Sequence, residues 1–332
     1  MICYNFYGDK MKVTILGSGA YGCALATVLN ENKHKVTLWT AFEKEADTLR
    51  NNLESPKLPG VKLPKELKFT TNMADIQNSD LIIMAIPTEF LNDVSKKLKK
   101  YYKNEPICIA TKGIEQGSCR FVYDIIKENL KTDALAVISG PSFAIDIAHK
   151  GTVGLTLASQ DKETINIVTK ALSNNHFKLR KTNDIVGTEI CGAIKNVIAI
   201  ASGIIAGMDQ TESTKAMFIT ESLHDIKSLI KGLGSDGDTV LTYAGFGDLL
   251  LTATSEKSRN YTLGYMIGKG APQEEINDYI KNTTIEGLYT LKAINDLVKD
   301  KDVDMPIINL IEEIIYKGKK PKALIDFLVK KP

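Results

Sequence analysis

Short apolar runs recur through the first half of the chain. They lie at residues 12–16, 36–40, 81–86, 107–111, 136–139 and 153–158. Most lack polar alternation, which is typical of strands buried on both faces of a parallel sheet. Small apolar residues at 23–29 follow the first run and fit a helix packed closely on that sheet. We therefore predict the α/β class, with a Rossmann-type doubly wound domain at residues 11–184.

After Asp184 the pattern changes to longer segments whose apolar residues recur at helical spacing. These segments are 185–208, 213–231, 248–256, 259–269, 284–299 and 306–315. They predict an all-helical second domain at residues 185–332, entered directly through the 185–208 helix. Its most apolar stretch, 197–208, is too short to span a bilayer, so we predict a buried helix. Residues 1–10 form an N-terminal extension ahead of a second methionine, Met11.

The composition is that of an ordinary globular protein, with 43% hydrophobic and 25% charged residues among 332. A net charge of +2 gives no electrostatic reason to expect nucleic acid or an acidic membrane as partner. The cysteines are odd in number and never form CxxC: Cys3, Cys23, Cys108, Cys119 and Cys191. We expect reduced thiols, no disulfide framework and no metal site. No signal peptide is visible at the N-terminus, and a cytoplasmic protein is expected.

A glycine-rich segment, GSGAYG at residues 17–22, follows the first predicted strand and opens the first predicted helix. In a GxGxxG turn, Gly17 makes the turn, Gly19 lets the backbone approach a pyrophosphate and Gly22 permits close helix packing. The phosphates bind at the helix N-terminus, where free N–H groups point outward. Glycines often merely punctuate turns, but here strand, turn, helix and second strand occur in order. This order predicts a dinucleotide site.

The choice between NAD and NADP stays open in the sequence. An acidic residue at the end of the second strand favours NAD, and a nearby arginine favours the phosphate of NADP. The chain continues after this strand as Thr40-Ala41-Phe42-Glu43-Lys44. Neither signal lies at the strand end, and Glu43 and Lys44 favour opposite answers.

A single lysine, Lys195, interrupts the most apolar predicted helix, and the residues on its own face are mostly small. Burial of an unpaired ammonium is costly and lowers its pKa, which suits proton transfer near neutral pH. The structural alternative is a lysine that reaches solvent or pairs with a core carboxylate. Because Asn196 adjoins it and a dinucleotide domain precedes it, we favour a catalytic lysine.

Two later segments have the side chains of an anion site. Asp248 follows two glycines in a position like a helix N-cap, and Thr252 lies one turn further along the same face. Ser258, Arg259 and Asn260 begin another helix, where a hydroxyl, a guanidinium and an amide can bind phosphate. Taken singly, Asp248 and Ser258 are as readily explained as helix caps, and Arg259 as a surface residue.

Taken together, these segments resemble the bacterial-type NAD(P)-dependent glycerol-3-phosphate dehydrogenases over nearly the whole chain after the extension. The matching segments are GSGAYGCALA (17–26), TKGIE (111–115), SGPSFA (139–144), GAIKNVIAIASG (192–203), GFGDLLLTATS (245–255), SRN (258–260) and IEG (285–287). Their order and spacing also match, which is more specific than any one motif. The resemblance implies reversible hydride transfer between sn-glycerol 3-phosphate and NAD or NADP, giving dihydroxyacetone phosphate. It also implies a supply of glycerol 3-phosphate for phospholipid synthesis, and a homodimer.

The resemblance also implies a role for individual residues. Lys195 is implied to accept the proton of the C2 hydroxyl, Lys112 to act as a second lysine at the reacting centre, and Asp248 to orient a lysine. The implied substrate-binding positions are Lys112, Gly140, Ser142, Lys195, Asp248, Thr252, Ser258, Arg259 and Asn260. The cofactor-binding positions, glycine turn included, are Gly17, Ser18, Gly19, Tyr21, Gly22, Lys112, Ala144, Arg259 and Glu286.

The chain departs from the family pattern at three places. Tyr21 stands where another large aromatic residue is usual, and Asp146 stands where glutamate is usual. Glu221-Ser222 replaces a common Arg-Gly, which removes an arginine contact.

Two other functions compete with the dehydrogenase. One is a ketopantoate or hydroxyacid reductase of the same architecture, and the other is a nicotinamide sensor without catalysis. Retention of Lys112, Lys195 and Asp248 argues against the sensor, which needs no proton acceptor.

Overall fold

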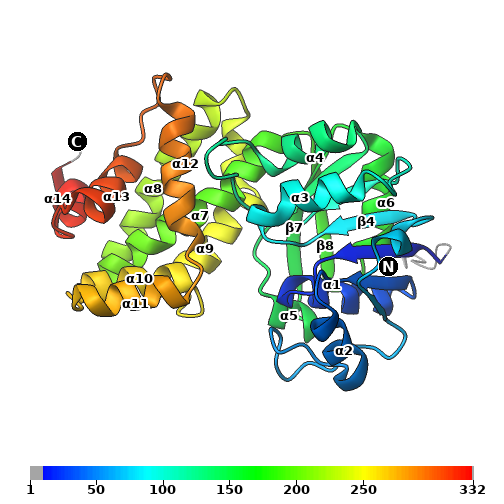
Figure 1. The fold of residues 1–332 in the computed structure, drawn as a ribbon. Coiled ribbons are helices and arrows are strands. Elements are labelled where there is room, and N and C mark those ends of the chain that lie inside the picture. The colour runs from blue at the N-terminus through cyan, green and yellow to red at the C-terminus, as the bar shows by residue number, and fades with distance from the viewer. Residues whose placement is uncertain (1–9, 331–332) are drawn as a thin grey trace. The chain divides into compact units, whose positions relative to one another are not determined.

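The computed structural model describes residues 10–330, so Cys3 and nearly all of the expected extension at 1–10 lie outside the described residues. The chain clusters into two compact units. Unit 1 runs to Lys112 and resumes at Phe121–Ile185; unit 2 consists of Gly113–Arg120 and the chain from Val186 onward. In Figure 1, unit 1 is coloured blue to green, and unit 2 is mostly green to red.

Unit 1 is built on an eight-stranded sheet in the order β3-β2-β1-β4-β5-β6-β7-β8. The strands are β1 (Lys12–Leu16), β2 (Lys35–Trp39), β3 (Lys68–Thr70), β4 (Leu81–Met84), β5 (Ile107–Ile109), β6 (Leu135–Ser139), β7 (Val153–Ala158) and β8 (Phe177–Thr182). All six predicted runs contain a strand. Because β1 pairs with both β2 and β4, the strand order reverses beside the end of β1. In open α/β sheets ligands bind at such a reversal.

Helices cover both faces of this sheet, each over its own apolar core. One core joins the sheet to α1 (Ala20–Glu31), α5 (Ala144–Ala148) and α6 (Lys162–Leu172). The other joins it to α3 (Thr88–Leu98) and α4 (Val122–Leu130). The predicted doubly wound fold is therefore confirmed.

Two features of the sheet differ from the prediction. β7 pairs antiparallel with β6, with Leu157 opposite Ile138, whereas a wholly parallel sheet was expected. An apolar run indicates a strand that is buried on both faces of the sheet, but it does not indicate whether that strand is parallel or antiparallel to its neighbours. β3 and β8 were not predicted. β3 has three residues, and the edge strand β8 has one buried residue, Phe177, among exposed and half-buried ones.

Unit 2 is helical, and every strand that the structure describes lies in unit 1. Its helices are α7 (Ile185–Gly207), α8 (Glu212–Gly232), α9 (Asp248–Ala253), α10 (Arg259–Gly268), α11 (Gln273–Asn282), α12 (Glu286–Val298), α13 (Pro306–Lys317) and α14 (Ala323–Lys330). α11 and α14 were not predicted. All the other α-helices of unit 2 correspond to a predicted segment.

The central helix α7 is longer than the apolar stretch that the sequence marked. Its 23 residues are enough to cross a bilayer, but 94% of its most apolar window is buried inside the protein. The prediction of a buried helix is confirmed. The prediction that this apolar segment is too short to span a bilayer was wrong, because the helix is longer than the apolar stretch. α10 packs on α7 with direct backbone contact, because a Cβ on Gly264 would lie 1.8 Å from the carbonyl oxygen of Ile200.

Candidate functional site

The glycine turn between β1 and α1 leaves no room for side chains at two of its three glycines. Gly17 has φ +117°, and a Cβ there would lie 2.3 Å from the carbonyl oxygen of Ala85. A Cβ on Gly22 would lie 2.0 Å from the carbonyl oxygen of Gly17. These contacts support the roles that the sequence analysis gave to both glycines, the turn and the close helix packing.

Gly19 differs, because a Cβ built on it meets no atom within 4 Å. It is the N-cap residue of α1, and no side chain caps that helix. The N–H groups of the first turn of α1 therefore adjoin open space at Gly19, and an anion is favoured at such a helix start. The turn fits the pyrophosphate of a dinucleotide.

The loops that follow β5 and β6 bring a second set of expected residues together in unit 1. Lys112 donates from Nζ to the carbonyl oxygen of Gly140 at 3.4 Å, and Ser142 Oγ donates to the same oxygen at 3.1 Å. Tyr21 Oη lies 3.1 Å from Ser142 Oγ, which ties α1 to the loop after β6. Thr88 Oγ1 donates to the backbone carbonyl of Lys112 at 2.9 Å. Lys112, Ser142 and Tyr21, expected from separate motifs, are thus neighbours.

In unit 2, Lys195 forms a buried ion pair. Its Nζ lies 2.7 Å from Asp248 Oδ1, and the two side chains are 13% and 2% exposed. Thr252 Oγ1 donates to the backbone carbonyl of Asp248 at 2.7 Å and lies 3.4 Å from Oδ1. A π-helical turn at Tyr243–Gly247 leads directly into α9, so Asp248 is the first helical residue. Its carboxylate binds the lysine and does not cap the helix.

The Lys195 contact is the one that the structural alternative anticipated, namely a lysine paired with a core carboxylate. An amine that is paired with a carboxylate can still take part in proton transfer. A carboxylate fixed beside the amine can orient the amine for proton transfer. The same contact matches the role that the resemblance implied for Asp248.

A second polar cluster joins α7, α10 and α12. Asn196 Nδ2 donates to Glu286 Oε2 at 2.9 Å, and Arg259 approaches Glu286 Oε1 at 3.7 Å. The N–H of Gly287 donates to Asn260 Oδ1 at 2.9 Å. The SRN and IEG segments are therefore brought to Asn196, the residue beside Lys195. The sequence analysis used Asn196 only as a neighbour of Lys195, and its bond to Glu286 had no signal in the sequence.

Ser258 has the role that the structural alternative gave it. Its Oγ accepts from the N–H of Tyr261 at 3.3 Å and caps α10. Arg259 is 54% exposed at the start of the same helix. Ala144, the remaining expected cofactor position, is half-buried at the start of α5 in unit 1.

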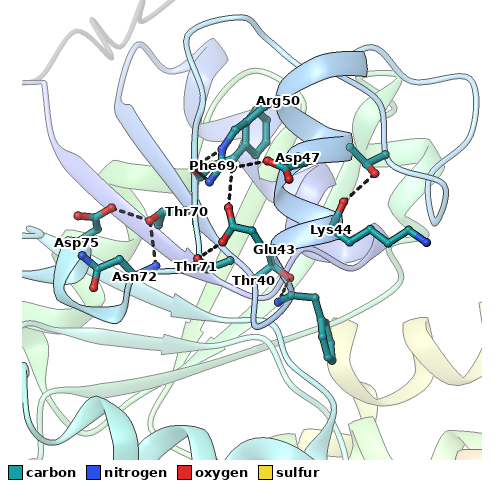
Figure 2. A network of polar contacts seen from close by, with 12 residues as sticks. Thr40, Glu43, Lys44, Asp47, Arg50, Phe69, Thr70, Thr71, Asn72 and Asp75 are labelled. Carbon is teal, nitrogen blue, oxygen red and sulfur yellow. Dashed lines mark hydrogen bonds and ion pairs between the residues drawn. The ribbon is translucent and has the colours of Figure 1, made fainter.

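A polar network surrounds the end of β2, where the sequence left the cofactor undecided. Figure 2 shows Glu43 between Arg50 and Thr71, with the Lys44 side chain extending away from them. Arg50 Nη1 lies 2.8 Å from Glu43 Oε1 and 2.7 Å from Asp47 Oδ1. Glu45, which the sequence analysis did not consider, accepts from Thr40 Oγ1 at 2.6 Å.

Residues 10–330 contain no group of three or more His, Cys, Asp or Glu side chains that could hold a metal ion. None of the described cysteines forms a disulfide: Cys23, Cys108, Cys119 and Cys191. Burial raises the pKa of the Cys23 thiol to about 11, so this thiol is protonated at neutral pH.

Comparisons with known proteins agree with this geometry. Residues 12–165 match the family model for the N-terminus of NAD-dependent glycerol-3-phosphate dehydrogenase, and residues 184–326 match its C-terminus. The chain is 33% identical to the glycerol-3-phosphate dehydrogenase [NAD(P)+] of Fusobacterium nucleatum, with 96% of each chain covered. The crystal structure of glycerol-3-phosphate dehydrogenase from Coxiella burnetii superposes with a TM-score of 0.88 at 29% identity, covering 97% of this chain and 99% of that one.

A ketopantoate reductase from Ralstonia eutropha is also similar, with a TM-score of 0.56 at 14% identity and coverage of 96% and 100%. That is a likeness of fold alone.

Proposed function

Because the chain belongs to the family of NAD-dependent glycerol-3-phosphate dehydrogenases, we propose that it interconverts sn-glycerol 3-phosphate and dihydroxyacetone phosphate with NAD or NADP. The observation that carries the proposal is the buried pair of Lys195 and Asp248 at 2.7 Å. A lysine that a carboxylate orients within an apolar helix can transfer a proton, and a nicotinamide sensor without catalysis would not need such a group.

In the proposed reaction, the neutral amine of Lys195 accepts the proton of the C2 hydroxyl during oxidation. The resulting ammonium, which is the form that pairs with Asp248, returns the proton during reduction. Asp248 holds the amine in place through its carboxylate, and the hydroxyl of Thr252 donates a hydrogen bond to the backbone carbonyl of Asp248. A nicotinamide cofactor held by unit 1 would supply the hydride chemistry at C2. The glycine turn at Gly17, Gly19 and Gly22 holds the pyrophosphate.

We assign binding of the substrate phosphate to the start of α10. Arg259 offers paired N–H donors there, and planar donor pairs match phosphate oxygens. Asn260 supports this end through its bond to the N–H of Gly287. Lys112, fixed beside Gly140 and Ser142, is the proposed second lysine that contacts substrate and cofactor.

The test follows absorbance of the reduced nicotinamide, with NADH and NADPH in parallel. We expect oxidation that depends on dihydroxyacetone phosphate, with kcat/KM at least about 100-fold lower for dihydroxyacetone, because remote binding energy is lost with the phosphate. Equal rates with both substrates would contradict the phosphate assignment. A folded protein that binds NADH but turns over neither substrate would contradict the proposed reaction.

The resemblance supports four finer proposals. The chain acts as a homodimer, it works in the cytoplasm, and it supplies glycerol 3-phosphate for phospholipid synthesis. Residues 11–184 and 185–332 serve as the cofactor-binding and the substrate-binding domain. Sedimentation at micromolar concentration tests the first proposal, because a species of one chain's mass would contradict the homodimer.

A further inference from the structure

We propose that Glu45 makes the enzyme selective for NAD(H) over NADP(H), by accepting a hydrogen bond from the adenosine 2′-hydroxyl and repelling a 2′-phosphate. The inference rests on the proposed function only in requiring a dinucleotide at the glycine turn. It resolves the choice that Glu43 and Lys44 left open in the sequence.

The first support is the position of the Glu45 carboxylate. α2 (Glu43–Asn52) starts shortly after β2 and carries Glu45 back over the end of that strand. The carboxylate accepts from Thr40 Oγ1, just beyond β2, at 2.6 Å. The hydroxyl of Ser18 in the glycine turn also acts on this carboxylate and helps to lower its pKa. Glu45 therefore lies at the strand end, on the side of the phosphate-binding turn.

That place has a known meaning in a Rossmann-type domain. The adenosine ribose lies between the glycine turn and the end of the second strand, and an acidic residue about 20 positions beyond the turn binds its 2′-hydroxyl. Glu45 satisfies this spacing approximately, as does Glu43, so the contacts of the two carboxylates decide between them. Glu45 does not stand at the strand end in the sequence, and its carboxylate reaches that end from the first turn of α2.

The second support is the charge of Glu45. Its side chain is 17% exposed, and this burial raises its pKa. Hydrogen bonds from Lys57, Thr40 and Ser18 outweigh burial, so the pKa of Glu45 lies below its ordinary value. The group is an anion at neutral pH. An anion accepts from a hydroxyl and repels a phosphate dianion.

The third support is the state of the nearby cations. Arg50 is held by Glu43 and Asp47 and also donates to the carbonyl oxygen of Phe69 at 3.3 Å. Lys57 Nζ lies 2.7 Å from Glu45 Oε1. Lys44 is exposed and extends away from the network in Figure 2. The charges of Arg50 and Lys57 are thus already compensated by carboxylates, which weakens the attraction of both groups for a 2′-phosphate.

Glu43 provides a matched control within the same helical turn. It also carries one negative charge, but its carboxylate accepts from Thr71 Oγ1 and Arg50 Nη1, on the side of β3. A general effect of charge predicts equal consequences for Glu43→Gln and Glu45→Gln. A specific contact with the ribose predicts a consequence for Glu45→Gln alone.

The experiment measures dissociation constants of NADH and NADPH by fluorescence titration at low ionic strength, without substrate, for the wild type, E45Q and E43Q. We expect the wild type to bind NADH at least about 10-fold more tightly than NADPH. E45Q narrows this ratio by about 10-fold, because the anion is lost and Lys57 is released. E43Q leaves Arg50 paired with Asp47 and bonded to the carbonyl oxygen of Phe69, so we expect it to change the ratio by less than about 2-fold.

A second probe requires no variant and guards against misfolding of E45Q. The 2′-deoxyadenosine analogue of NAD lacks the proposed donor, and we expect the wild type to bind it about 10-fold more weakly than NAD. Equal affinity for NADH and NADPH, equal shifts in E45Q and E43Q, or undiminished affinity for the deoxy analogue would each overturn the proposal. A measured preference for NADH without turnover of dihydroxyacetone phosphate would support this inference while contradicting the proposed reaction.

Discussion

Lys195 and Asp248 form a charged pair in which both partners are largely withdrawn from water. Desolvation offsets much of the attraction between such partners, so a buried pair is weak evidence for a stabilising role. Removal of either partner is nevertheless costly, since it strands a buried charge. The proposed reaction gives this pair, which joins α7 to α9, a use that stability alone does not supply.

Arg259 gives the residue-scale prediction for the substrate phosphate. We expect Arg259→Ala to raise the KM for dihydroxyacetone phosphate by at least about 10-fold, because charge-assisted hydrogen bonds to the phosphate are lost. Stability should change by less than about 1 kcal/mol, since its pair with Glu286 is 3.7 Å long and half-exposed on both sides. Steady-state kinetics and thermal unfolding measure both effects.

Arg259→Lys is the control, because it keeps the charge and loses the planar donor pair. Its KM should lie between those of the wild type and Arg259→Ala. An unchanged KM in the alanine variant would show that the phosphate binds elsewhere.

At the scale of elements, the contact between α7 and α10 depends on glycines at matching positions. A Cβ on Gly264 would lie 1.8 Å from Ile200 O, and one on Gly203 would lie 2.1 Å from Tyr261 O. The obstructing atoms belong to the backbone and cannot rotate away. This close approach places the start of α10, with its SRN segment, near the polar end of α12 and Asn196.

We expect Gly264→Ala to lower the free energy of unfolding by about 1–3 kcal/mol or more, because the two helices must separate to admit the methyl group. Tyr265→Ala, which truncates an exposed side chain on the same helix, should cost less than about 1 kcal/mol. Thermal unfolding of both variants tests the contact. A Gly264→Ala protein as stable as the wild type would show that α7 and α10 do not touch.

The N-cap of α6 gives a pH-dependent prediction. Asp161 accepts from the N–H of Glu163 at 3.3 Å and of Thr164 at 2.9 Å. Hydrogen bonding, chiefly from the Thr164 side chain, lowers the pKa of Asp161 below its ordinary value of 3.8. A lowered folded-state pKa means that the stabilisation is fully present above the unfolded-state pKa. It disappears as the pH falls through the folded-state pKa.

Asp161→Ala should therefore cost about 1 kcal/mol at pH 7, and the difference from the wild type should shrink below about pH 4. Asp161→Asn retains an N-cap acceptor, so it should lose only a few tenths of a kcal/mol at pH 7. Denaturant unfolding at several pH values measures this. A cost for Asp161→Ala that stays constant from pH 7 to pH 3 would contradict a charged cap.

The elements that the sequence predicted well are those whose burial is extreme. The central strands and α7 are almost wholly apolar, and their residues alone require an interior position. Edge strand β8 and the surface helix α11 bury few side chains, so their apolar periodicity is weak. Strand direction at β7 is set by the path of the chain, which local composition does not encode.

At the scale of the whole molecule, motifs marked individual residues but gave few of the contacts that join them. Gly17, Gly22 and Lys195 were recognisable from their local context. The bond of Lys195 to Asp248 joins residues 53 positions apart, and the bond of Asn196 to Glu286 joins residues 90 positions apart. Glu45 was not predicted, because several residues separate it from the end of β2 in the sequence. The first turn of α2 brings its carboxylate back to that strand end.

The division of labour between the two units leads to a direct test. The cofactor turn lies in unit 1, and the proposed proton acceptor lies in unit 2. A substitution at Lys195 should therefore remove chemistry and leave dinucleotide binding intact. Lys195→Met suits this purpose, because it keeps most of the side-chain length without a titratable group.

The decisive measurement determines kcat with dihydroxyacetone phosphate and the dissociation constant of NADH for the wild type and Lys195→Met, with folding verified by circular dichroism. We predict a kcat lowered by about 10²- to 10⁴-fold with an NADH affinity within about 3-fold of the wild type. A kcat within about 10-fold of the wild type would contradict the role of Lys195 as proton acceptor.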